Sequence, residues 1–525
     1  MKKTLKLMLL LSLALLPGCR EGRGVQTAEN PLTYTDIPDN DVIRVGDTYY
    51  MVSTTMFFCP GAPIMESKDL VHWRIVSYVY DCLEDDDFYN LRNGKNAYGR
   101  GQWATSLRYH DGEFYVLFIA NEQGNRSYVY KTSDIVNGPW ERTVIDRKLH
   151  DASLLFDGDS LFVVYGGGDI RILELEPDAG AVKEGGVDQV LLSAPREGIG
   201  LRAEGAHFYH IGDYYYLIEI SWPLGGCRRE TCWRSKDLLG PYESKVVLDG
   251  QFDGRTDGVA QGAIVDTQFG DWYAIQFQDH GAVGRIPTIQ PVTWVDGWPI
   301  MGDNTHPMKE VEVRLKESGE DYVWACDEFD SDRLALVWQW NHKPVDGGWS
   351  LAERPGWMRL RTGQIATDIT NARGTLTQRT FGPVCTSEVL LDASALRPGD
   401  RAGLCAFQSN NVCIGAEISA DGSRNLVVRE QHPGAGESIV HSEPLESDRI
   451  YLKIDYAFTP PEGDPRPADT ATVSWSYDGK SWNKADYTLE MKYTLDFFIG
   501  YRSALYCYAT AEAGGWADFD YFRQY

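Results

Sequence analysis

Three acidic residues stand at matching places in the sequence, each a short distance before a Gly/Asp turn. Asp39 and Asp151 lie seven residues before the glycine of their turn, and Glu204 lies eight residues before its own. A solvated strand end would explain one such acid, but three at equivalent places predict carboxylates that converge on one pocket. Two carboxylates facing each other across a pocket can cleave a glycosidic bond, because one protonates the leaving oxygen while the other activates water. A third acid nearby would raise the pKa of the proton donor by like-charge repulsion.

The elements that must position these acids are five copies of one pattern. Each copy is a strand, a Gly/Asp turn and an aromatic strand, and the copies occupy residues 42–52, 107–117, 154–164, 201–216 and 263–275. They recur at intervals of roughly 50 to 65 residues, with no helical periodicity between them. Repeats built only of strands at this spacing predict a five-bladed β-propeller, in which closure of the ring protects the sheet edges.

In a propeller the innermost strand of each blade lines the central axis, so the three acids are expected to meet there. At the equivalent places in the other two blades, residues 102–105 and 261–262 offer Trp103 and amide side chains, which suit a sugar pocket. His280 follows the fifth repeat and is expected either in the core or directed toward the axis.

The second part of the chain has a different character. The repeats stop after Met308, and residues 316–321 form a plausible hinge. From about Trp324 onward, short alternating strands are separated by Pro-Gly and Asp-Gly turns, which predicts an antiparallel β-sandwich. The chain is therefore predicted to be all-β, with a five-bladed β-propeller over residues 31–318 and a β-sandwich over residues 324–525.

The N-terminus has the pattern of a bacterial secretion signal. Three lysines precede an apolar run over residues 7–16, which is too short to span a bilayer as a mature helix. Residues 16–19, Leu-Pro-Gly-Cys, resemble a lipobox, whose cysteine becomes the lipidated first residue of the mature protein. We therefore predict a signal peptide over residues 1–18, lipidation of Cys19, a tether over residues 19–30 and a location in the cell envelope. An ordinary cleaved signal with a chance cysteine is the alternative.

Composition excludes several classes of function. The 525 residues carry a formal net charge of −26, which becomes −29 once the three lysines of the signal are removed. So acidic a protein is a poor ligand for nucleic acid or anionic lipid, and membrane contact is expected only through the lipid anchor. No phosphate-binding loop, Ser-His-Asp series or metal-ligand motif occurs in the sequence, so no cofactor is expected to be required.

The cysteines do not imply a disulfide framework. Nine of them follow Cys19, an odd number, and their spacing fits no zinc or redox pattern. Cys227 and Cys232 are the pair that could form a bridge, and the others are expected to be free buried thiols.

Several motifs taken together resemble glycoside hydrolase family 43. They lie at residues 38–50, 60–65, 67–73, 150–154, 203–205 and 278–287. The likeness is to the β-xylosidases and α-L-arabinofuranosidases of that family that carry a C-terminal concanavalin-like sandwich, and it covers nearly the whole mature chain. It implies an inverting, exo-acting hydrolase that releases xylose or arabinofuranose from plant cell-wall oligosaccharides or polysaccharides.

The resemblance also assigns catalytic roles, residue by residue. Asp39 falls on the general base, Asp151 on the residue that tunes the pKa of the acid, and Glu204 on the general acid. One departure is Asn40, where the family usually has proline. This change is expected to loosen the backbone at the base, and it leaves Asp41 as a rival base.

Three substrate-binding residues follow from the same resemblance, namely Arg285, Trp103 and His280. In some members the histidine lies near a calcium ion, so a bound calcium is an expectation at His280. A loop of the sandwich is expected to lean over the pocket mouth, with the aromatic stretch 497–508 as the candidate. Such a loop would make the pocket blind and favour exo-cleavage. The choice between xylose and arabinofuranose depends on loop shapes and stays open.

Three other interpretations remain. A five-bladed retaining fructosidase of the invertase kind would need a shorter carboxylate separation, about 5 Å against about 6.5–9.5 Å for inversion. A non-catalytic glycan-binding envelope lipoprotein would keep the pocket but gain nothing from three converging acids. A purely structural envelope protein would leave those acids unexplained.

Overall fold

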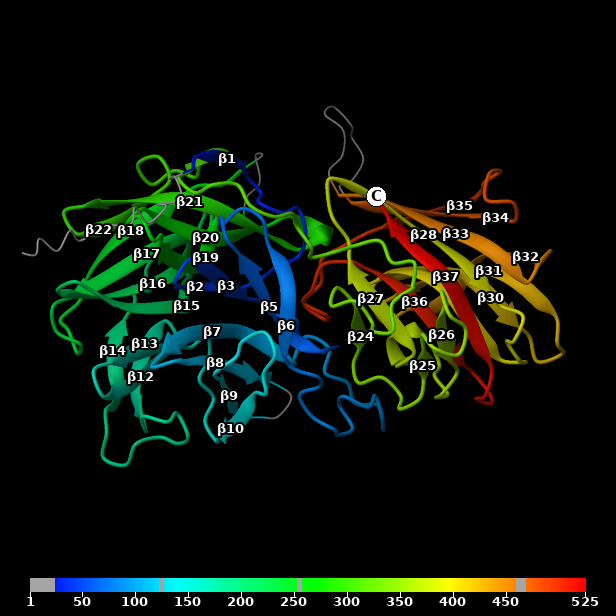
Figure 1. The fold of residues 1–525 in the computed structure, drawn as a ribbon, viewed down its shortest axis with the longest axis horizontal. Coiled ribbons are helices and arrows are strands. Elements are labelled where there is room, and N and C mark those ends of the chain that lie inside the picture. The colour runs from blue at the N-terminus through cyan, green and yellow to red at the C-terminus, as the bar shows by residue number, and fades with distance from the viewer. Residues whose placement is uncertain (1–23, 122–123, 125, 253–256, 459–468) are drawn as a thin grey trace, which may run out of the picture.

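The computed structural model describes residues 24–121, 124, 126–252, 257–458 and 469–525. The predicted signal peptide over residues 1–18 and the predicted lipidation site Cys19 therefore lie outside the described residues. Two β-rich halves lie side by side, with the propeller at the left of Figure 1 and the sandwich at the right. In the part of the chain that is described, no helix is long and apolar enough to cross a membrane.

Five four-stranded antiparallel sheets form the propeller, and within each sheet the strands pair in sequence order. Blade one contains β2 (Asp41–Val45), β3 (Thr48–Val52), β5 (Gly61–Ser67) and β6 (Arg74–Tyr80), and blade two contains β7 (Gln102–His110), β8 (Glu113–Ala120), β9 (Ser127–Thr132) and β10 (Glu141–Ile145). Blade three contains β11 (Ser153–Asp157), β12 (Ser160–Gly167), β13 (Asp169–Leu175) and β14 (Asp188–Ser193), and blade four contains β15 (Ile199–Ile211), β16 (Tyr214–Pro223), β17 (Arg229–Ser235) and β18 (Glu243–Asp249). Blade five contains β19 (Ala260–Asp266), β20 (Trp272–Asp279), β21 (Arg285–Val295) and β22 (Trp298–Met301). The first two strands of each blade coincide with one predicted repeat, so the five-bladed propeller is confirmed.

Glycine is required in the turns that join the first two strands of three blades. Gly46, Gly158 and Gly212 have φ angles of 66°, 59° and 61°. This left-handed conformation suits the tight turns of hairpins, and side chains other than glycine adopt it at a cost. The glycines used to align the three acids are therefore structurally equivalent.

The N-terminal segment contributes a strand to the propeller. β1 (Gln26–Glu29) pairs with β23 (Glu310–Val313), and Ala28 packs in a core cluster with Val311. The prediction of a tether over residues 19–30 is therefore wrong for residues 26–29. Its polar composition concealed a short strand in which only one side chain is buried.

The predicted hinge is fixed to the propeller. The backbone N–H of Ser318 donates to Asp69 over 2.8 Å, and the N–H of Trp73 donates to Asp321 over 2.8 Å. Residues 316–321 therefore run along blade one as a bound connection. The side chain of Asp321 and the backbone of Ser318 make these hydrogen bonds to the propeller.

The second half of the chain is a sandwich of two antiparallel sheets, as predicted. One sheet has the order β32 (Gly436–Pro444), β31 (Arg424–His432), β30 (Asn411–Ile418), β29 (Asp400–Phe407), β36 (Arg502–Ala509), β27 (Thr375–Arg379), β24 (Gln339–Asn341) and β4 (Phe58–Cys59). The other has the order β25 (Trp349–Ser350), β26 (Met358–Arg361), β37 (Trp516–Gln524), β28 (Val384–Asp392), β33 (Arg449–Ala457), β34 (Thr470–Ser476) and β35 (Asn483–Glu490).

Propeller and sandwich form one packed body. β4 comes from the propeller sequence but pairs with β24 of the sandwich, which sets Cys59 opposite Trp340. One apolar cluster contains Phe57 from the propeller together with Phe407 and Phe497 from the sandwich. Burial of apolar area is the main favourable term in such contacts. The expected apolar contact between the two domains is confirmed.

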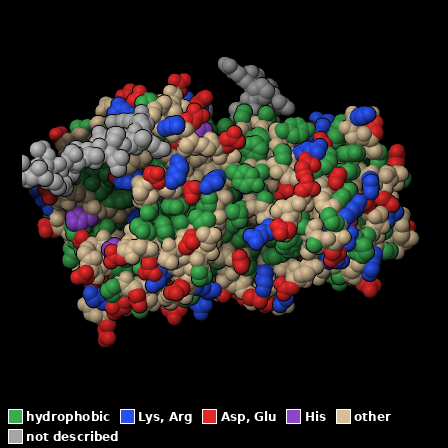
Figure 2. Space-filling view, viewed as in Figure 1, with side chains coloured by type: hydrophobic (Ala, Val, Ile, Leu, Met, Phe, Trp, Pro, Cys, Tyr) green, Lys and Arg blue, Asp and Glu red, His purple; other side chains and the backbone are tan. Residues whose placement is uncertain are grey.

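Charged side chains of both signs are spread over the face shown in Figure 2, where acidic residues are distributed across it with basic residues among them. The nine cysteines of the described chain are all free, so Cys227 and Cys232 do not form the bridge that was left open.

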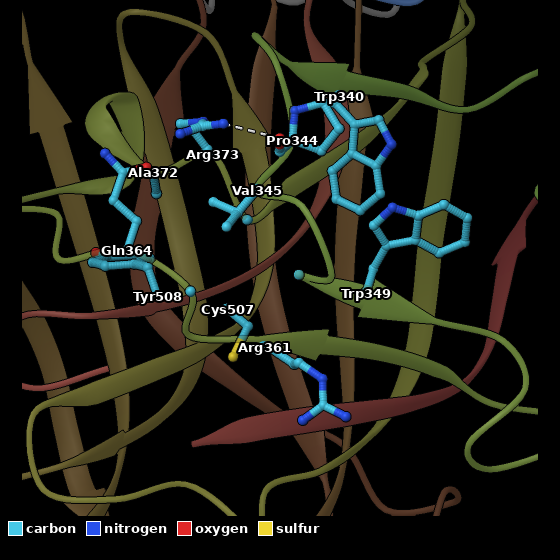
Figure 3. Close-up of a pocket in the computed structure, with 13 residues that line it drawn as sticks. Trp340, Pro344, Val345, Trp349, Arg361, Gln364, Ala372, Arg373, Cys507 and Tyr508 are labelled. Atoms are coloured by element: carbon cyan, nitrogen blue, oxygen red, sulfur yellow. Dashed lines mark hydrogen bonds between the residues drawn. The ribbon is translucent and has the colours of Figure 1, made fainter. Parts of the chain in front are cut away.

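One hollow in the sandwich, between Trp340, Trp349, Arg373 and Tyr508, is shown in Figure 3. Arg373 donates to the carbonyl oxygen of Pro344 over 2.9 Å at its edge. The free volume is about 10 Å³, which suits one water molecule. This hollow is too small for a sugar ring.

Candidate active site

One cavity of about 230 Å³ lies where the first strands of the five blades meet. Each blade contributes one polar or aromatic side chain from this inner region, namely Asp39, Trp103, Asp151, Glu204 and Gln261. The remaining lining residues are Ala104, His150, Leu201, Ile220, Trp222, Arg228, Arg285, Leu495 and Phe498. The three acids that the repeat register aligns therefore do line one pocket.

The backbone at or next to each acid departs from regular strand geometry. Asp39 and Asp151 each lie two residues before the first strand of their blade, with φ angles of 52° and 46°. Non-glycine residues hold such angles only where the surroundings fix them. Glu204 lies inside β15, where the pairing with β16 shifts register on both sides of it, and Gly205 follows with a φ of 68°.

Asp39 is bonded to an arginine on one side. Its Oδ1 accepts a hydrogen bond from Nη1 of Arg285 over 2.7 Å, while its side chain is only 6% exposed. The turn around Asp39 is held as well, because the Asn40 amide donates to the carbonyl of Ile37 over 3.1 Å and the Ser53 hydroxyl donates to that of Pro38 over 2.8 Å. The expectation that Asn40, in place of proline, loosens this backbone stays a prediction.

Asp41, the rival base, does not reach the cavity. It is 1% exposed, and its Oδ2 accepts hydrogen bonds from the N–H of Leu107 over 2.8 Å and from Nη1 of Arg108 over 2.7 Å. These bonds tie blades one and two together. The geometry leaves Asp39 as the carboxylate that can meet a water molecule in the pocket.

The other two acids form a cluster with a histidine. The imidazole of His150 lies 3.5 Å from Asp151 through Nδ1 and 3.6 Å from Glu204 through Nε2. Oδ2 of Asp151 accepts the N–H of Gly205 over 3.1 Å, which links it to the residue after Glu204. Asp39 lines the same cavity without belonging to this cluster.

Electrostatics couple this cluster. Burial raises the pKa of Asp151 to about 6; repulsion from Glu204 and Asp39 adds to this, and His150 opposes it. Burial by itself would lower the pKa of His150, but Glu204 and Asp151 together raise it above its usual value. The protonation of Asp151 therefore depends on the charges of its neighbours.

His150 was not predicted as a site residue, although it directly precedes Asp151. With Asp151 and Glu204 it is also the one group of at least three metal-ligand side chains found in the described residues, with ligand atoms within 4.8 Å of one another. One imidazole and two carboxylates suit a transition-metal ion better than calcium, which prefers oxygen ligands. The calcium expectation at His280 stays a prediction.

His280 lies behind the pocket. Its Nδ1 is 3.2 Å from the Tyr34 hydroxyl, its Nε2 is 3.2 Å from the Gln278 amide, and it is not among the lining residues. The structure therefore brings Arg285 and Trp103 to the cavity wall as predicted, but not His280. Its buried surroundings match the core alternative.

A chain of charges runs along the wall on the side of blades four and five. Arg285 pairs with Asp39 and also with Asp279, over 3.2 Å, and Asp279 pairs in turn with Arg228. Arg228 lies 5.2 Å from the ring of Trp222. Neither Arg228 nor Trp222 was predicted, because they follow the end of a repeat in a stretch with no recognisable pattern.

One side of the pocket is lined by residues of the sandwich. Phe498, on the loop between β35 and β36, lies 5.5 Å from the Trp103 ring and 4.5 Å from the guanidinium of Arg285. The predicted stretch 497–508 thus includes the residue that reaches the site. Leu495, just before that stretch, also lines the cavity.

A buried carboxylate fixes this loop to the propeller. Asp36 accepts the N–H of Arg285 through Oδ1 over 2.8 Å and the N–H of Gly500 through Oδ2 over 2.9 Å. Burial raises the pKa of Asp36, against these bonds and the nearby arginines Arg502 and Arg379. One side chain thus sets both Arg285 and the sandwich loop in place.

The sequence matches two protein families and several known proteins. Residues 28–299 match the family described as Glycosyl hydrolases family 43, and residues 326–524 match the Beta xylosidase C-terminal Concanavalin A-like domain. The beta-xylosidase of Formosa agariphila is 28% identical over 565 residues, which cover 95% of this chain and 90% of that protein. The non-reducing end alpha-L-arabinofuranosidase BoGH43B of Bacteroides ovatus is 33% identical over 357 residues, which cover 64% of this chain and 65% of that protein.

Among solved structures, the bifunctional GH43-CE protein of Bacteroides eggerthii has a TM-score of 0.89 and 41% identity to this chain. The match covers 96% of this chain and 64% of that protein. The chain thus spans somewhat less than two thirds of that relative, and nearly all of its own length is accounted for.

Proposed function

The chain belongs to glycosyl hydrolase family 43, and on that premise we propose that it is an inverting, exo-acting glycosidase that releases single xylose or arabinofuranose units. The observation that carries the proposal is the convergence of Asp39, Asp151 and Glu204 on one cavity at the propeller axis. The names of the relatives, beta-xylosidase and non-reducing end alpha-L-arabinofuranosidase, support a pentose as the released sugar. Membership of glycosyl hydrolase family 43 also favours this inverting reaction over the retaining reaction of a fructosidase.

In the proposed reaction Glu204 is the general acid and Asp39 the general base. Glu204 gives its proton to the glycosidic oxygen of the leaving group as the bond to the anomeric carbon breaks. Asp39 takes a proton from a water molecule whose oxygen attacks the anomeric carbon from the opposite face. The bond of Asp39 to Arg285 uses Oδ1, so Oδ2 is the oxygen that accepts the proton of water. One displacement inverts the configuration and uses no cofactor.

Asp151 and His150 act through Glu204 in this scheme. Asp151 holds the backbone next to Glu204 through Gly205, and its charge favours the protonated form of a neighbouring acid. His150 contacts both carboxyl groups and balances their charge. Trp103 and Phe498 supply apolar faces on which a sugar ring can pack, as aromatic side chains do in ligand pockets.

The contribution of the sandwich to the pocket supports exo-cleavage. Phe498 and Leu495 line one side of the cavity, and we propose that they block a longer glycan there, so that one terminal sugar enters the cavity and the rest of the chain stays outside. We propose plant cell-wall oligosaccharides or polysaccharides as the source of that sugar. We also propose that a lipid on Cys19 holds the enzyme in the cell envelope.

A substrate panel tests the proposal. Purified protein is incubated with aryl β-xylosides, aryl α-L-arabinofuranosides and the matching oligosaccharides, and the products are separated by chromatography. We expect single pentose units as first products, and no products from Asp39→Asn or Glu204→Gln on the oligosaccharides. Binding of these sugars without turnover would instead identify a glycan-binding protein, and release of longer fragments would contradict exo-cleavage.

A further inference from the structure

The buried carboxyl group of Glu230 lies behind the pocket wall, apart from the catalytic cluster. Glu230, on β17, is fully buried, and its Oε1 accepts a hydrogen bond from Nε2 of Gln276, on β20, over 3.2 Å. Its Oε2 and the Oε1 of Gln276 are both buried without a hydrogen bond in the described structure. Buried polar atoms without partners are rare and destabilising, so two in neighbouring side chains require a common explanation.

A proton on Glu230 provides that explanation. A neutral carboxylic acid donates one hydrogen bond through its O–H, while an ionised one can only accept. With the proton on Oε2, Glu230 donates to Oε1 of Gln276 and accepts from Nε2, which makes a cyclic acid–amide pair. The second N–H of Gln276 points at Sδ of Met301, 3.1 Å away, and this fixes the orientation of the amide.

The surroundings favour the neutral form. Burial raises the pKa of Glu230 to about 8, against smaller opposite effects of Gln276, Gln261 and Arg228. Arg228 is the cation nearby, and it is already paired with Asp279. The other titratable groups near Glu230 are Glu219 on β16, Tyr209 on β15 and Cys232 on its own strand β17.

The Glu230–Gln276 pair lies beside a residue of the pocket. Gln276 pairs with Gly262 between β20 and β19, and the preceding residue, Gln261, lines the cavity and has a φ of 63°. Gln261 forms a bulge, because the pairing of β19 with β20 shifts between Ala260 and Gly262. Its side chain packs closely on the segment of the general acid, since a Cβ added to Gly205 would lie 2.9 Å from Cδ of Gln261.

We propose that Glu230, as a neutral acid paired with Gln276, is a positioning residue that holds Gln261 in its left-handed conformation and so sets the sugar-binding geometry of the pocket. The inference rests on the proposed function, because the sugar in the cavity is what Gln261 positions. Ionisation of Glu230 removes the bond it donates and leaves an anion beside Glu219. Substrate affinity should therefore fall in the alkaline range while the catalytic carboxyls keep their places.

Two variants and one matched control test the proposal. Glu230→Gln keeps both hydrogen bonds to Gln276 without a titrating proton, and Glu230→Leu removes them. The control is Glu219→Gln, which neutralises another fully buried carboxyl, on the neighbouring strand β16, that has no hydrogen bond to the pocket wall. KM and kcat for an aryl pentoside are measured from pH 6 to about 9, and infrared difference spectra record protonated carboxyl groups.

The expected results separate KM from kcat. In the native enzyme KM rises above about pH 8, and in Glu230→Gln it stays flat with a neutral-pH value within about twofold of the native one. Glu230→Leu raises KM about tenfold with a smaller change in kcat, and Glu219→Gln leaves the native KM profile in place. The infrared spectrum loses one protonated carboxyl band at pH 7 in Glu230→Gln.

Other results would overturn the proposal. An unchanged carboxyl band in Glu230→Gln shows that Glu230 is ionised, and an unchanged KM in Glu230→Leu shows that it positions nothing. If Glu230→Leu does not fold, the pH dependence of KM in Glu230→Gln still decides. The infrared result does not depend on turnover, so failure of the pentoside reaction itself is recognised separately.

Discussion

The ring of Phe498, from the sandwich, lies 4.5 Å from the guanidinium of Arg285, from the propeller. That guanidinium in turn donates to Asp39 over 2.7 Å. The contact between the two domains therefore reaches the proposed base, Asp39, through a single side chain, that of Arg285. Asp36 holds both sides of this contact, because it accepts the backbone N–H groups of Arg285 and Gly500. The sandwich completes the active site as well as the fold.

Replacing Phe498 should reduce activity without unfolding the protein. In Phe498→Ala the guanidinium of Arg285 loses a cation–π contact, which is worth about 0.5–2 kcal/mol, and the sugar loses an apolar face. We expect kcat/KM to fall about tenfold or more, with the melting temperature little changed. Leu495→Ala is the control, since Leu495 lines the cavity but is 76% exposed; an equal loss in both variants would show that the Arg285 contact has no special role.

Asp39→Asn and Asp41→Asn should fail in different ways. Without Asp39 no group activates water, so turnover should fall by about 10²–10⁴-fold or more on every substrate while the fold persists. Asp41→Asn weakens a buried ion pair with Arg108, so it should lower the free energy of unfolding. Activity per folded molecule should then be largely retained. The two variants are compared by kinetics and urea unfolding, and the reverse pattern would move the base to Asp41.

Glu204→Gln should show a dependence on the leaving group. Sugar leaving groups need a proton to depart, so hydrolysis of xylo- or arabino-oligosaccharides should nearly disappear. Dinitrophenyl glycosides depart without that help and should retain much more activity. Parallel kinetics on the two substrate types provide the measurement, and equal losses on both would remove Glu204 from the role of acid.

Asp151→Asn should stabilise the protein in a pH-dependent way. Because burial raises the pKa of Asp151 to about 6, the folded state binds this proton more tightly than the unfolded chain. The contribution of Asp151 is therefore complete below about pH 4 and is lost as the pH rises to about 6, by at most about 3 kcal/mol.

Urea unfolding at pH 4 and pH 7 measures this effect. Asp151→Asn should match the native protein at pH 4 and be about 1–3 kcal/mol more stable at pH 7, while its activity falls. The control is Asp157→Asn, which lies in the same blade outside the pocket. Equal stability differences at both pH values would contradict the assignment of a raised pKa to Asp151.

Much of the site could be predicted because it follows the repeat. The turn glycines align Asp39, Asp151 and Glu204, and the same register points to Trp103 and Gln261, each of which lines the cavity. These positions are fixed by strand alternation and the closure of the ring. Sequence and structure therefore agree where a side chain is placed by a regular element.

The residues that were missed belong to irregular segments or depend on neighbours in space. Trp222 and Arg228 flank a turn outside any repeat. His150 belongs to the site because its imidazole lies near Asp151 and Glu204, and Glu204 is 54 residues away in sequence. His280 was placed by resemblance, but its hydrogen bonds keep it behind the wall. Such contacts arise only from packing, which the linear pattern does not contain.

The anomeric configuration of the first released sugar tests the central claim most directly. Early-time proton NMR follows the native enzyme on a pentose oligosaccharide before the free sugar mutarotates. If Asp39 activates water and Glu204 protonates the leaving oxygen in one displacement, the first product carries the inverted configuration. A first product with retained configuration would show that a carboxylate attacks the sugar itself, and it would contradict the role assigned to Asp39.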